Sequence, residues 1–459
     1  MQIFTLKNVM RIFLLIALTF QLMACGLHIG PENAVLTQED LNHLPAWQSD
    51  NLEDAVSATS LFTLFDSPQL RMLVDEALAA NPDLQQAALN LQIVQVELRQ
   101  AKGDQIPLVD ADLSMGKEEA SEELYTGALS VSWTLDIWGK LRDITRAGDM
   151  EVNEKRALLQ AARNDLVAEV MGYWLQLVAT SHDIGLQTRR VETLLKTENY
   201  ILSRYRSGLG DLQDLDSARS ATSSARATLV EYQETRKRLQ RTLQILLGKT
   251  TVLTIDLPEN YPVVLTPLVE VPEQTLGRRP DLKAAYYAIR SADLKTSVAY
   301  KELLPEINLS AVLEDIGDSP SSLLLADPLW TLLGDLAAPL FHGGTLRAEA
   351  EIAELEAAQT YQVYRQTLLS AIGEVENGLA YEQELSQRIV LVESALKSAR
   401  NSLATYRNSY RAGLVDILDL LSVQKATYDL EFELDDLVYN KLANRIQLGL
   451  ALGLGVTEL

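Results

Sequence analysis

Cysteine, histidine and positive charge are scarce in this chain of 459 residues. One cysteine excludes a disulfide framework and a cysteine-rich metal site, and the four histidines lack metal-ligand spacing. The 40 basic side chains are outnumbered by 63 acidic ones, and the net charge of -23 argues against nucleic-acid binding. The sequence also lacks a nucleophile elbow, a phosphate-binding loop and metal-ligand spacing. We therefore expect neither an enzymatic activity nor a cofactor.

Proline is missing from two long stretches, 108–257 and 343–459. Within residues 139–207 the apolar side chains recur every three or four positions, which predicts an amphipathic helix. An unbroken helix of this length would be about 100 Å long. A helix so long must pack along partners, as in a coiled coil or a helical tube.

The chain contains the same turn twice. Residues 205–221 (YRSGLGDLQDLDSARSA) and 410–426 (YRAGLVDILDLLSVQKA) match at nine positions with a constant offset of 205. In both copies a glycine, Gly208 or Gly413, is followed by aspartates, which is typical of a tight turn between two helices. We therefore predict two structural repeats, each formed by a helix, a β-hairpin, a very long helix, a turn and a long returning helix.

The predicted boundaries follow from this duplication. We expect an extended N-terminal arm at 25–65, a proline-rich connector at 249–272, and repeats at 66–248 and 273–455. The long helices are predicted at 139–207, 211–248, 343–411 and 416–453.

Each repeat also contains two stretches in which apolar and polar residues alternate, which is typical of half-buried strands. The strands are predicted at about 104–116, 124–138, 304–314 and 329–341. Their length suits a tilted strand that crosses a membrane, although a soluble sandwich is the alternative. Four strands cannot close a barrel in lipid, whereas three copies of the chain would supply twelve. The candidates for interfacial aromatic girdles are Tyr125, Trp133, Trp138 and Trp330.

The N-terminus has the pattern of a secretory signal peptide. Two basic residues precede an apolar run at 12–22 that is short for a membrane-spanning helix, and the run ends in Leu-Met-Ala-Cys. This ending resembles a bacterial lipobox, which implies removal of residues 1–24 and acylation of Cys25. An ordinary signal peptide with an incidental cysteine is the alternative. Because Gly26 rather than aspartate follows, the resemblance favours the outer membrane.

Several motifs occur in the order found in the TolC-like outer-membrane efflux channels, and the chain resembles the lipoprotein branch of that family. Besides the lipobox, the motifs are LDIWGKLR at 135–142, RRPDL at 278–282, PLFHGG at 339–344 and YRAGLVD at 410–416. The resemblance implies a mainly helical fold with a membrane β-barrel portion. It also implies a homotrimer with a twelve-stranded barrel in outer-membrane lipid, and a helical tunnel in the periplasm. Its expected partners are a periplasmic adaptor (membrane fusion protein) and an inner-membrane pump of the RND type.

The function implied is that of an exit duct for small molecules in a tripartite efflux pump. The alternatives are the outer-membrane component of type I protein secretion and a periplasmic adaptor lipoprotein. An adaptor would have one helical hairpin between soluble β-domains, and the duplicated strands argue against it.

The two turns hold the candidate site residues. Asp211, Asp214, Asp416 and Asp419 begin the returning helices. At the second turn, Asp416 can cap the helix and Asp419 can complement its dipole. Alternatively, three copies could ring a channel mouth, raise one another's pKa and favour cations. The resemblance assigns the aperture to the second turn, with Tyr410 and Arg411 as latch residues. Ser422 stands where the family commonly has a further aspartate, which limits the expected ring to Asp416 and Asp419.

Overall fold

The computed structural model describes residues 33–47, 57–65, 67–117, 123–251, 255–267, 269–270, 272–317, 319 and 328–456. Cys25 and the lipobox lie outside the described residues. The chain divides into two compact units. Unit 1 comprises 1–43, 90–156 and 283–366, and unit 2 comprises 44–89, 157–282 and 367–459. None of the described helices is both long enough and apolar enough to cross a membrane.

Helices form most of the described chain. The short ones are α2 (Asn33–Asn42), η1 (Leu61–Thr63), α3 (Pro68–Ala80) and α7 (Pro272–Arg278). The longer ones are α4 (Pro82–Gly103), α5 (Lys140–Arg206), α6 (Leu212–Leu246), α8 (Pro280–Lys301), α9 (Thr345–Arg411) and α10 (Ile417–Ala451). The strands are β1 (Ser57–Ala58), β2 (Leu108–Gly116), β3 (Leu124–Thr134), β4 (Thr266–Pro267), β5 (Glu306–Gly317) and β6 (Leu329–Ala337).

The two repeats correspond residue by residue. Helices α5 and α9 both have 67 residues, and α6 and α10 both have 35, each pair beginning 205 positions apart. Helices α4 and α8 both have 22 residues and begin 198 positions apart. All four expected long helices and all four expected strands have an observed counterpart, although each strand begins or ends a few residues from the predicted bounds.

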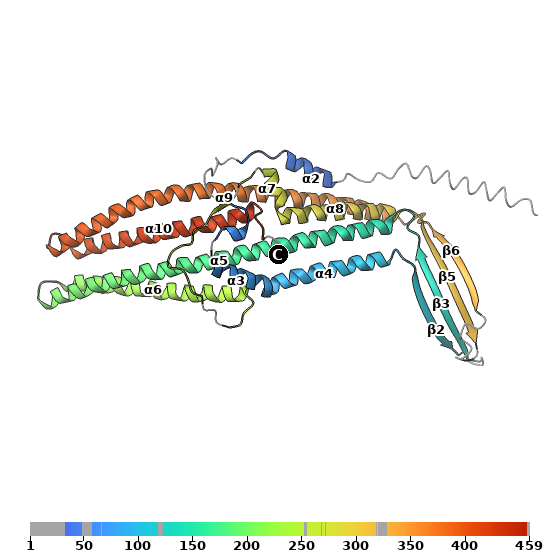
Figure 1. The fold of residues 1–459 in the computed structure, drawn as a ribbon, viewed down its shortest axis with the longest axis horizontal. Helices are drawn as coiled ribbons and strands as arrows, with labels where there is room; N and C mark the ends of the chain where they lie inside the picture. The colour runs from blue at the N-terminus through green and yellow to red at the C-terminus, as the bar shows by residue number, and fades with distance from the viewer. Residues whose placement is uncertain are drawn as a thin grey trace, which may run out of the picture. The chain divides into compact units, whose positions relative to one another are not determined.

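Unit 1 is built on one antiparallel sheet with the strand order β2-β3-β5-β6 (Figure 1). Helices flank one end of this sheet in a matching order. Helix α4 lies beside α5, where Gln105 donates to the backbone oxygen of Leu141 over 3.1 Å. Helix α8 lies beside α9, where Thr296 donates to the backbone oxygen of Ala353 over 3.0 Å. Strands β2 and β6 are therefore the sheet edges, and α4 and α9 are the outer helices.

Unit 1 also contains α2, within the segment predicted to be an extended arm. That prediction is wrong for residues 33–42. The apolar spacing along α2 is weak, so the sequence pattern gave little sign of a helix. Instead, contacts to α8 and α9 hold it. Asp293 accepts hydrogen bonds from the Asn33 side chain and the Ala34 backbone at 3.0 and 3.2 Å, and Tyr361 donates to Asp40 over 2.9 Å.

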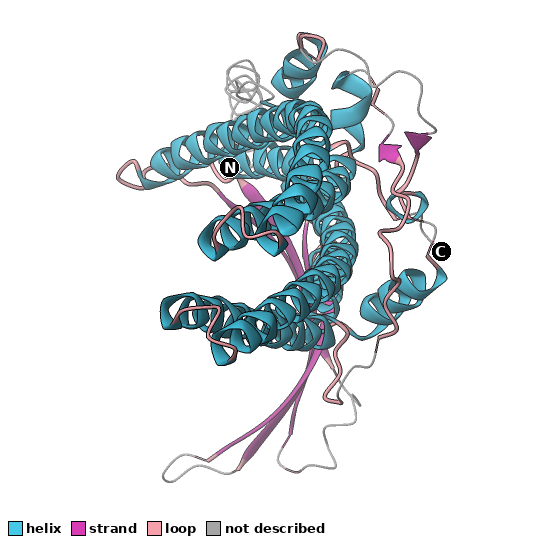
Figure 2. Ribbon diagram, turned by 90° about the vertical axis from the view of Figure 1, so that its left-hand side faces the viewer, coloured by secondary structure: helices cyan, strands magenta, loops and turns pink. Residues whose placement is uncertain are grey.

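Unit 2 contains the two helical hairpins, formed by α5 with α6 and by α9 with α10. They lie side by side with both turns at the same end (Figures 1 and 2). Each hairpin is fastened at its other end in an equivalent way. The Asn81 side chain donates to the backbone oxygen of Leu246, the last residue of α6, over 3.0 Å. Its counterpart Arg279 donates to the backbone oxygen of Ala451, the last residue of α10, over 3.1 Å.

Arg279 does more than bind this carbonyl. Its guanidinium also forms ion pairs of 2.7 Å with Asp281 and with Glu374 of α9. A largely buried arginine needs such partners, because desolvating an unpaired charge is costly. The Arg-Pro-Asp motif thus starts α8 and ties it to both helices of the second hairpin.

Candidate functional site: the paired helical turns

The two turns have the same backbone structure. Gly208 and Gly413 have φ angles of 70° and 74°, in the left-handed region that glycine enters without the steric cost of a Cβ atom. The next residue in each turn donates its N–H back to the end of the preceding helix. Leu209 reaches the carbonyl of Arg204, and Leu414 reaches that of Ser409, both over 2.9 Å. Such bonds satisfy carbonyls that a helix end leaves free, so the glycines are required by the turn.

Two of the aspartates are helix caps. The Asp211 side chain accepts from the backbone N–H of Asp214 over 2.7 Å, and Asp416 accepts from that of Asp419 over 2.9 Å. Asp211 and Asp416 have extended backbones, as expected of residues that precede the first helical turn. The predicted capping role of Asp416 is therefore confirmed, and Asp211 caps the first returning helix in the same way.

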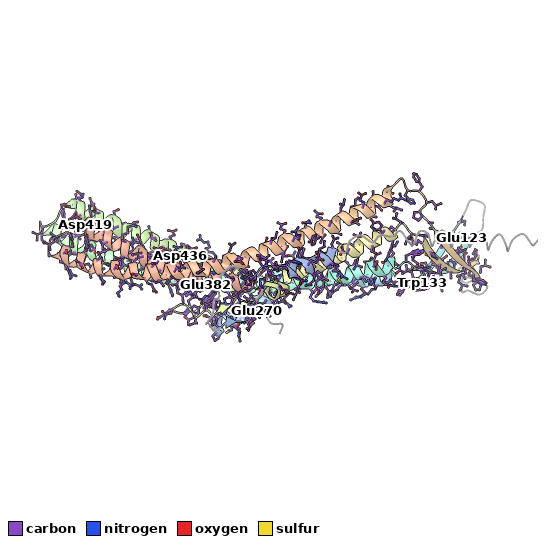
Figure 3. The ribbon with its side chains drawn as sticks, turned by 90° about the horizontal axis from the view of Figure 1, so that it is seen from above. Glu123, Trp133, Glu270, Glu382, Asp419 and Asp436 are labelled. Atoms are coloured by element: carbon purple, nitrogen blue, oxygen red, sulfur yellow. The ribbon has the colours of Figure 1, made fainter. Side chains whose placement is uncertain are left out.

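The four aspartates remain accessible, and three of them interact electrostatically. Asp211, Asp416 and Asp419 are exposed, while Asp214 is half-buried. Partial burial raises the pKa of Asp214, and the negative charges of Asp211 and Asp416 raise it further, against the opposing effect of Arg204. Acidic groups of both turns thus act on one carboxyl within a single chain. Figure 3 shows Asp419 near the turn of the second hairpin.

An apolar cluster packs the two turns together. Its buried members come from all four helices and are Ile201, Leu215, Ala218, Leu403, Tyr410, Ile417 and Leu420. Leu215 and Leu420 are counterparts in the two repeats. Because this cluster combines both hairpins, the turns form one structural unit within the chain.

The two expected latch residues have different environments. Tyr410 is only 5% exposed and packs against the first hairpin, with the guanidinium carbon of Arg204 5.8 Å from its ring centre. The Tyr200 ring meets the Tyr410 ring edge-on at a centroid distance of 6.0 Å. Arg411 is exposed and forms no ion pair with any described residue. Arg411 thus takes no part in the ring contacts that Tyr410 makes with Arg204 and Tyr200 of the first hairpin.

Sequence reasoning missed Arg204. Its counterpart in the second repeat is Ser409. The comparison of the repeats looked for identical residues, whereas Arg204 is marked by a difference between them. Tyr410 has the counterpart Tyr205, which is 41% exposed. The same tyrosine is thus buried in one repeat, where it joins the apolar cluster beside Arg204, and exposed in the other.

Comparison with known proteins agrees with this architecture. The chain matches the family described as outer membrane efflux protein over residues 73–249 and 271–454. A probable outer membrane lipoprotein, SilC of Salmonella typhimurium, is 25% identical over 406 residues, covering 86% of this chain and 87% of SilC. The cation efflux system protein CusC of Escherichia coli O6:H1 is 27% identical, with the same coverage of both chains.

A solved structure supports the fold. The outer-membrane channel OprN superposes with a TM-score of 0.81 at 22% identity, over 90% of this chain and 97% of OprN. The family matches cover both repeats and break only at the connector. This protein is therefore a member of the outer membrane efflux protein family and has the TolC-like channel fold.

Proposed function

We propose that this protein is the outer-membrane exit duct of a tripartite efflux pump that exports small molecules. The observation that carries the proposal is the open four-stranded sheet joined to two helical hairpins with acidic turns. Such a chain contains strands that suit a membrane and helices that suit a tunnel, together with a polar mouth. Its membership of the efflux family and its similarity to CusC, a cation efflux protein, support the same role.

The proposed assembly is a homotrimer with a twelve-stranded barrel. Every residue of the two edge strands, β2 and β6, is exposed, so the sheet can continue on both sides. In lipid an unpaired strand edge is costly, and closure with further strands removes it. The exposed apolar residues on β2 and β3, including Leu113, Met115 and Trp133, suit contact with lipid (Figure 3 shows Trp133).

The chain would be held in the outer membrane by the barrel and by acyl groups on Cys25. The similar protein SilC is named as a lipoprotein, which supports the lipobox assignment. Several acyl chains give firm anchoring, whereas a single chain gives only marginal binding. Replacement of Cys25 should therefore remove the acyl anchor and leave the barrel as the only anchor in the membrane.

The turns would meet the periplasmic adaptor, which connects the duct to an inner-membrane pump of the RND type. Leu209 and Leu414 are counterparts in the two turns and are 68% and 77% exposed. Exposed apolar side chains beside capped helix ends suit docking of a partner's helical tip. The adjacent aspartates would form the acidic ring at the mouth, with Asp416 and Asp419 as the candidate gate residues.

Two measurements test the function together. Purified protein should form conducting trimers in planar bilayers. A strain that lacks the gene should become more susceptible to drugs, solvents or metal ions, and the wild-type gene should reverse the change. Loss of a secreted protein with unchanged susceptibility would instead establish type I secretion. Absence of conductance from correctly assembled trimers would reject the duct.

A further inference from the structure

The two hairpins of unit 2 meet where α5 of the first lies beside α10 of the second. Polar side chains join these helices, as at Thr193 and Tyr428, whose hydroxyl oxygens lie 2.9 Å apart. Farther from the turns, Nδ1 of His182 lies 3.1 Å from the Asp435 carboxylate, and each of these two side chains is only 18% exposed. This hairpin seam therefore contains a titratable pair that is shielded from solvent.

The connector is held at the same point. The Tyr261 hydroxyl donates to the other oxygen of the Asp435 carboxylate over 2.8 Å. The Tyr261 ring meets the His182 ring edge-on at a centroid distance of 4.3 Å. Within the described chain, the hydrogen bonds between residues 255–261 and the helices all involve Asp435 or His182. One carboxylate thus holds α5 and this part of the connector together.

The next part of the connector is fastened separately. Arg445 of α10 donates to the Val264 carbonyl over 2.6 Å, and β4 pairs with β1. Loss of the contacts at Asp435 would therefore free residues 255–261 without detaching residues 264–267.

A second carboxyl beside the histidine lacks a neutralising partner. Asp183 is half-buried and forms no hydrogen bond or ion pair with any described residue. Burial and the negative charges of Asp435 and Asp436 raise the pKa of Asp183 to about 6, although His182 opposes them. The hydrogen bond with Asp435 raises the pKa of His182 above its ordinary value, against the effect of burial. In this packed arrangement both groups therefore bind a proton more readily than they do in water.

The histidine also has an unused nitrogen. Nε2 of His182 is buried and forms no hydrogen bond with any described residue. With a proton Nε2 becomes a donor, and the backbone oxygen of Glu259 on the connector favours this charged form. Protonation of His182 thus adds a contact to the connector and strengthens the pair with Asp435.

Every element around this point contributes charged or titratable side chains. They are Arg189 and Arg190 of α5, Glu231, Tyr232 and Arg236 of α6, Glu259 of the connector, Arg400 of α9, and Glu431, Asp436 and Tyr439 of α10. Burial raises the pKa of Tyr232, Tyr261 and Tyr439, so all three stay neutral. Arg400 and Glu431 form an ion pair of 2.8 Å and neutralise each other.

Acid and neutral conditions leave different charges in the seam. In acid His182 is a cation beside Asp435, and Asp183 is neutral. At higher pH the imidazole is neutral, and Asp183 becomes a third carboxylate beside Asp435 and Asp436. Like charges in a partly desolvated place repel one another strongly. Because the packed arrangement binds protons more tightly than a loosened one, its stability relative to the loosened one falls as the pH rises through these pKa values.

The side chains of His182, Asp183, Tyr261 and Asp435 are here called the clasp. We propose that the clasp takes up protons in acid and then holds residues 255–261 on the hairpin seam and α5 against α10, and that it releases both at neutral pH. The clasp lies within one chain. Only its expected effect on the aperture, a lower conductance in acid, rests on the proposed function.

Hydrogen exchange of the full-length protein in detergent tests the clasp. The readout is the protection factor of residues 255–261, which corrects for the effect of pH on intrinsic exchange. In the wild type it should rise about tenfold from pH 7.5 to pH 5.5, because one unit of pKa shift changes an equilibrium tenfold and partial exposure limits the effect. A protection factor independent of pH would overturn the proposal.

Two variants separate the titrating groups. Asp183→Asn is neutral at every pH and should raise the protection factor at pH 7.5 by about threefold over the wild type. His182→Gln carries the residue of the second repeat, Gln387, and should keep low protection at both pH values. The control is Asp256→Asn, an exposed carboxyl of the same connector outside the clasp, which should match the wild type. Wild-type behaviour of both clasp variants, or an equal change in the control, would contradict the clasp.

Conductance in planar bilayers separates the clasp from the duct. The difference in conductance between pH 5.5 and pH 7.5 should be smaller in Asp183→Asn than in the wild type. Trimers with pH-dependent protection that fail to conduct would reject the duct and keep the clasp. Conducting trimers without pH-dependent protection would keep the duct and reject the clasp.

Discussion

The guanidinium carbon of Arg204 lies 5.8 Å from the centre of the Tyr410 ring and joins the two hairpins of one chain near their turns. Arg204 also donates to the carbonyl of Leu209 over 3.0 Å, so the same side chain braces the first turn. Tyr410 is buried beneath it. One arginine therefore couples the geometry of the first turn to the packing of the second.

Replacing Arg204 should loosen both turns. A cation–π contact contributes about 0.5–2 kcal/mol, so Arg204→Ala should speed amide hydrogen exchange at residues 207–212 and 412–417 by about 2- to 30-fold. The matched control is Ser409→Ala at the corresponding position of the second repeat, which should leave exchange unchanged. Faster exchange at the first turn alone would mean that Arg204 braces its own hairpin without joining the two.

The charge and the capping role of Asp416 can be separated. Asparagine caps a helix about as well as aspartate does, whereas alanine loses about 1 kcal/mol. Asp416→Asn/Asp419→Asn should therefore fold normally and reduce the cation preference of trimers in planar bilayers, because the proposed acidic ring loses its charge. The control is Asp211→Asn/Asp214→Asn in the first turn, where a smaller change is expected. Unchanged selectivity in the first variant would leave Asp416 with capping alone.

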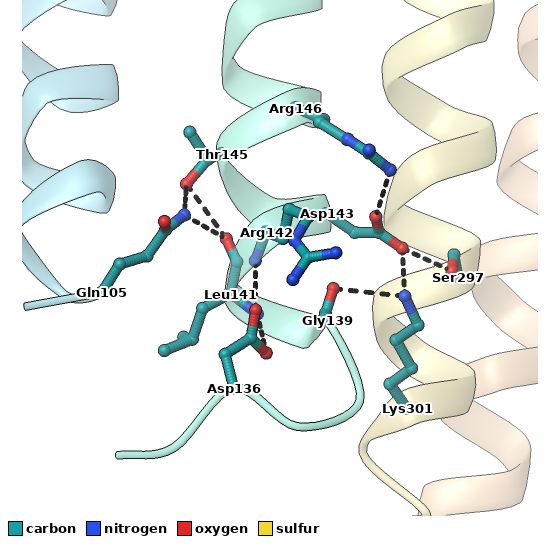
Figure 4. A network of polar contacts seen from close by, with 10 residues as sticks. All are labelled: Gln105, Asp136, Gly139, Leu141, Arg142, Asp143, Thr145, Arg146, Ser297 and Lys301. Carbon is teal, nitrogen blue, oxygen red and sulfur yellow. Dashed lines mark hydrogen bonds and ion pairs between the residues drawn. The ribbon is translucent and has the colours of Figure 1, made fainter. Parts of the chain in front are cut away.

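The ion pair between Asp143 of α5 and Lys301 of α8 should dominate the stability of the junction between these two helices (Figure 4). Removing one partner of a buried pair leaves an uncompensated charge, so Asp143→Ala should destabilise the fold by about 3 kcal/mol. The double variant Asp143→Leu/Lys301→Met should lose less, because no charge stays buried. The exposed pair of Lys102 and Asp149, with side chains 53% and 44% exposed, provides the control. Lys102→Met should change the free energy of unfolding, measured by thermal unfolding, by less than about 1 kcal/mol.

Much of the fold could be predicted because the chain repeats itself. The match between the two turns located Gly208 and Gly413, and the cap at Asp416 followed from an aspartate after the glycine. Proline-free stretches located the long helices. These features depend on local chemistry, namely glycine at positive φ and side-chain capping, and a sequence displays local chemistry directly.

The contacts between repeats could not be predicted in the same way. Arg204 meets Tyr410 across about 200 residues of sequence, and Asp143 meets Lys301 across 158. Nothing local distinguishes either cation from the other lysines and arginines of exposed helix faces. Helix α2 is a similar case, because its stability comes from Asp293 of α8 rather than from its own pattern. Tertiary partners determine these contacts and the stability of α2. The available sequence signal was the set of positions at which the two repeats differ.

A half-buried carboxyl in unit 2, that of Asp183, makes the stability depend on pH. Burial, together with the negative charges of Asp435 and Asp436 and against the opposing effect of His182, raises the pKa of Asp183 from 3.8 to about 6. Below about pH 4 Asp183 is protonated in both the folded and the unfolded chain and costs nothing. Between about pH 4 and 6 the unfolded chain releases the proton while the folded chain retains it, so the free energy of unfolding falls as pH rises.

Asp183→Asn should remove this penalty. A shift of two pKa units corresponds to at most about 3 kcal/mol, and partial solvation reduces the expected gain to about 1–2 kcal/mol at pH 7. At pH 4 the variant and the wild type should unfold at the same temperature. Thermal unfolding of the detergent-solubilised protein across pH 4–8 measures both values, with Asp216→Asn as an exposed control on α6. An equal gain at pH 4 and pH 7 would show that the substitution acts through packing rather than through the proton.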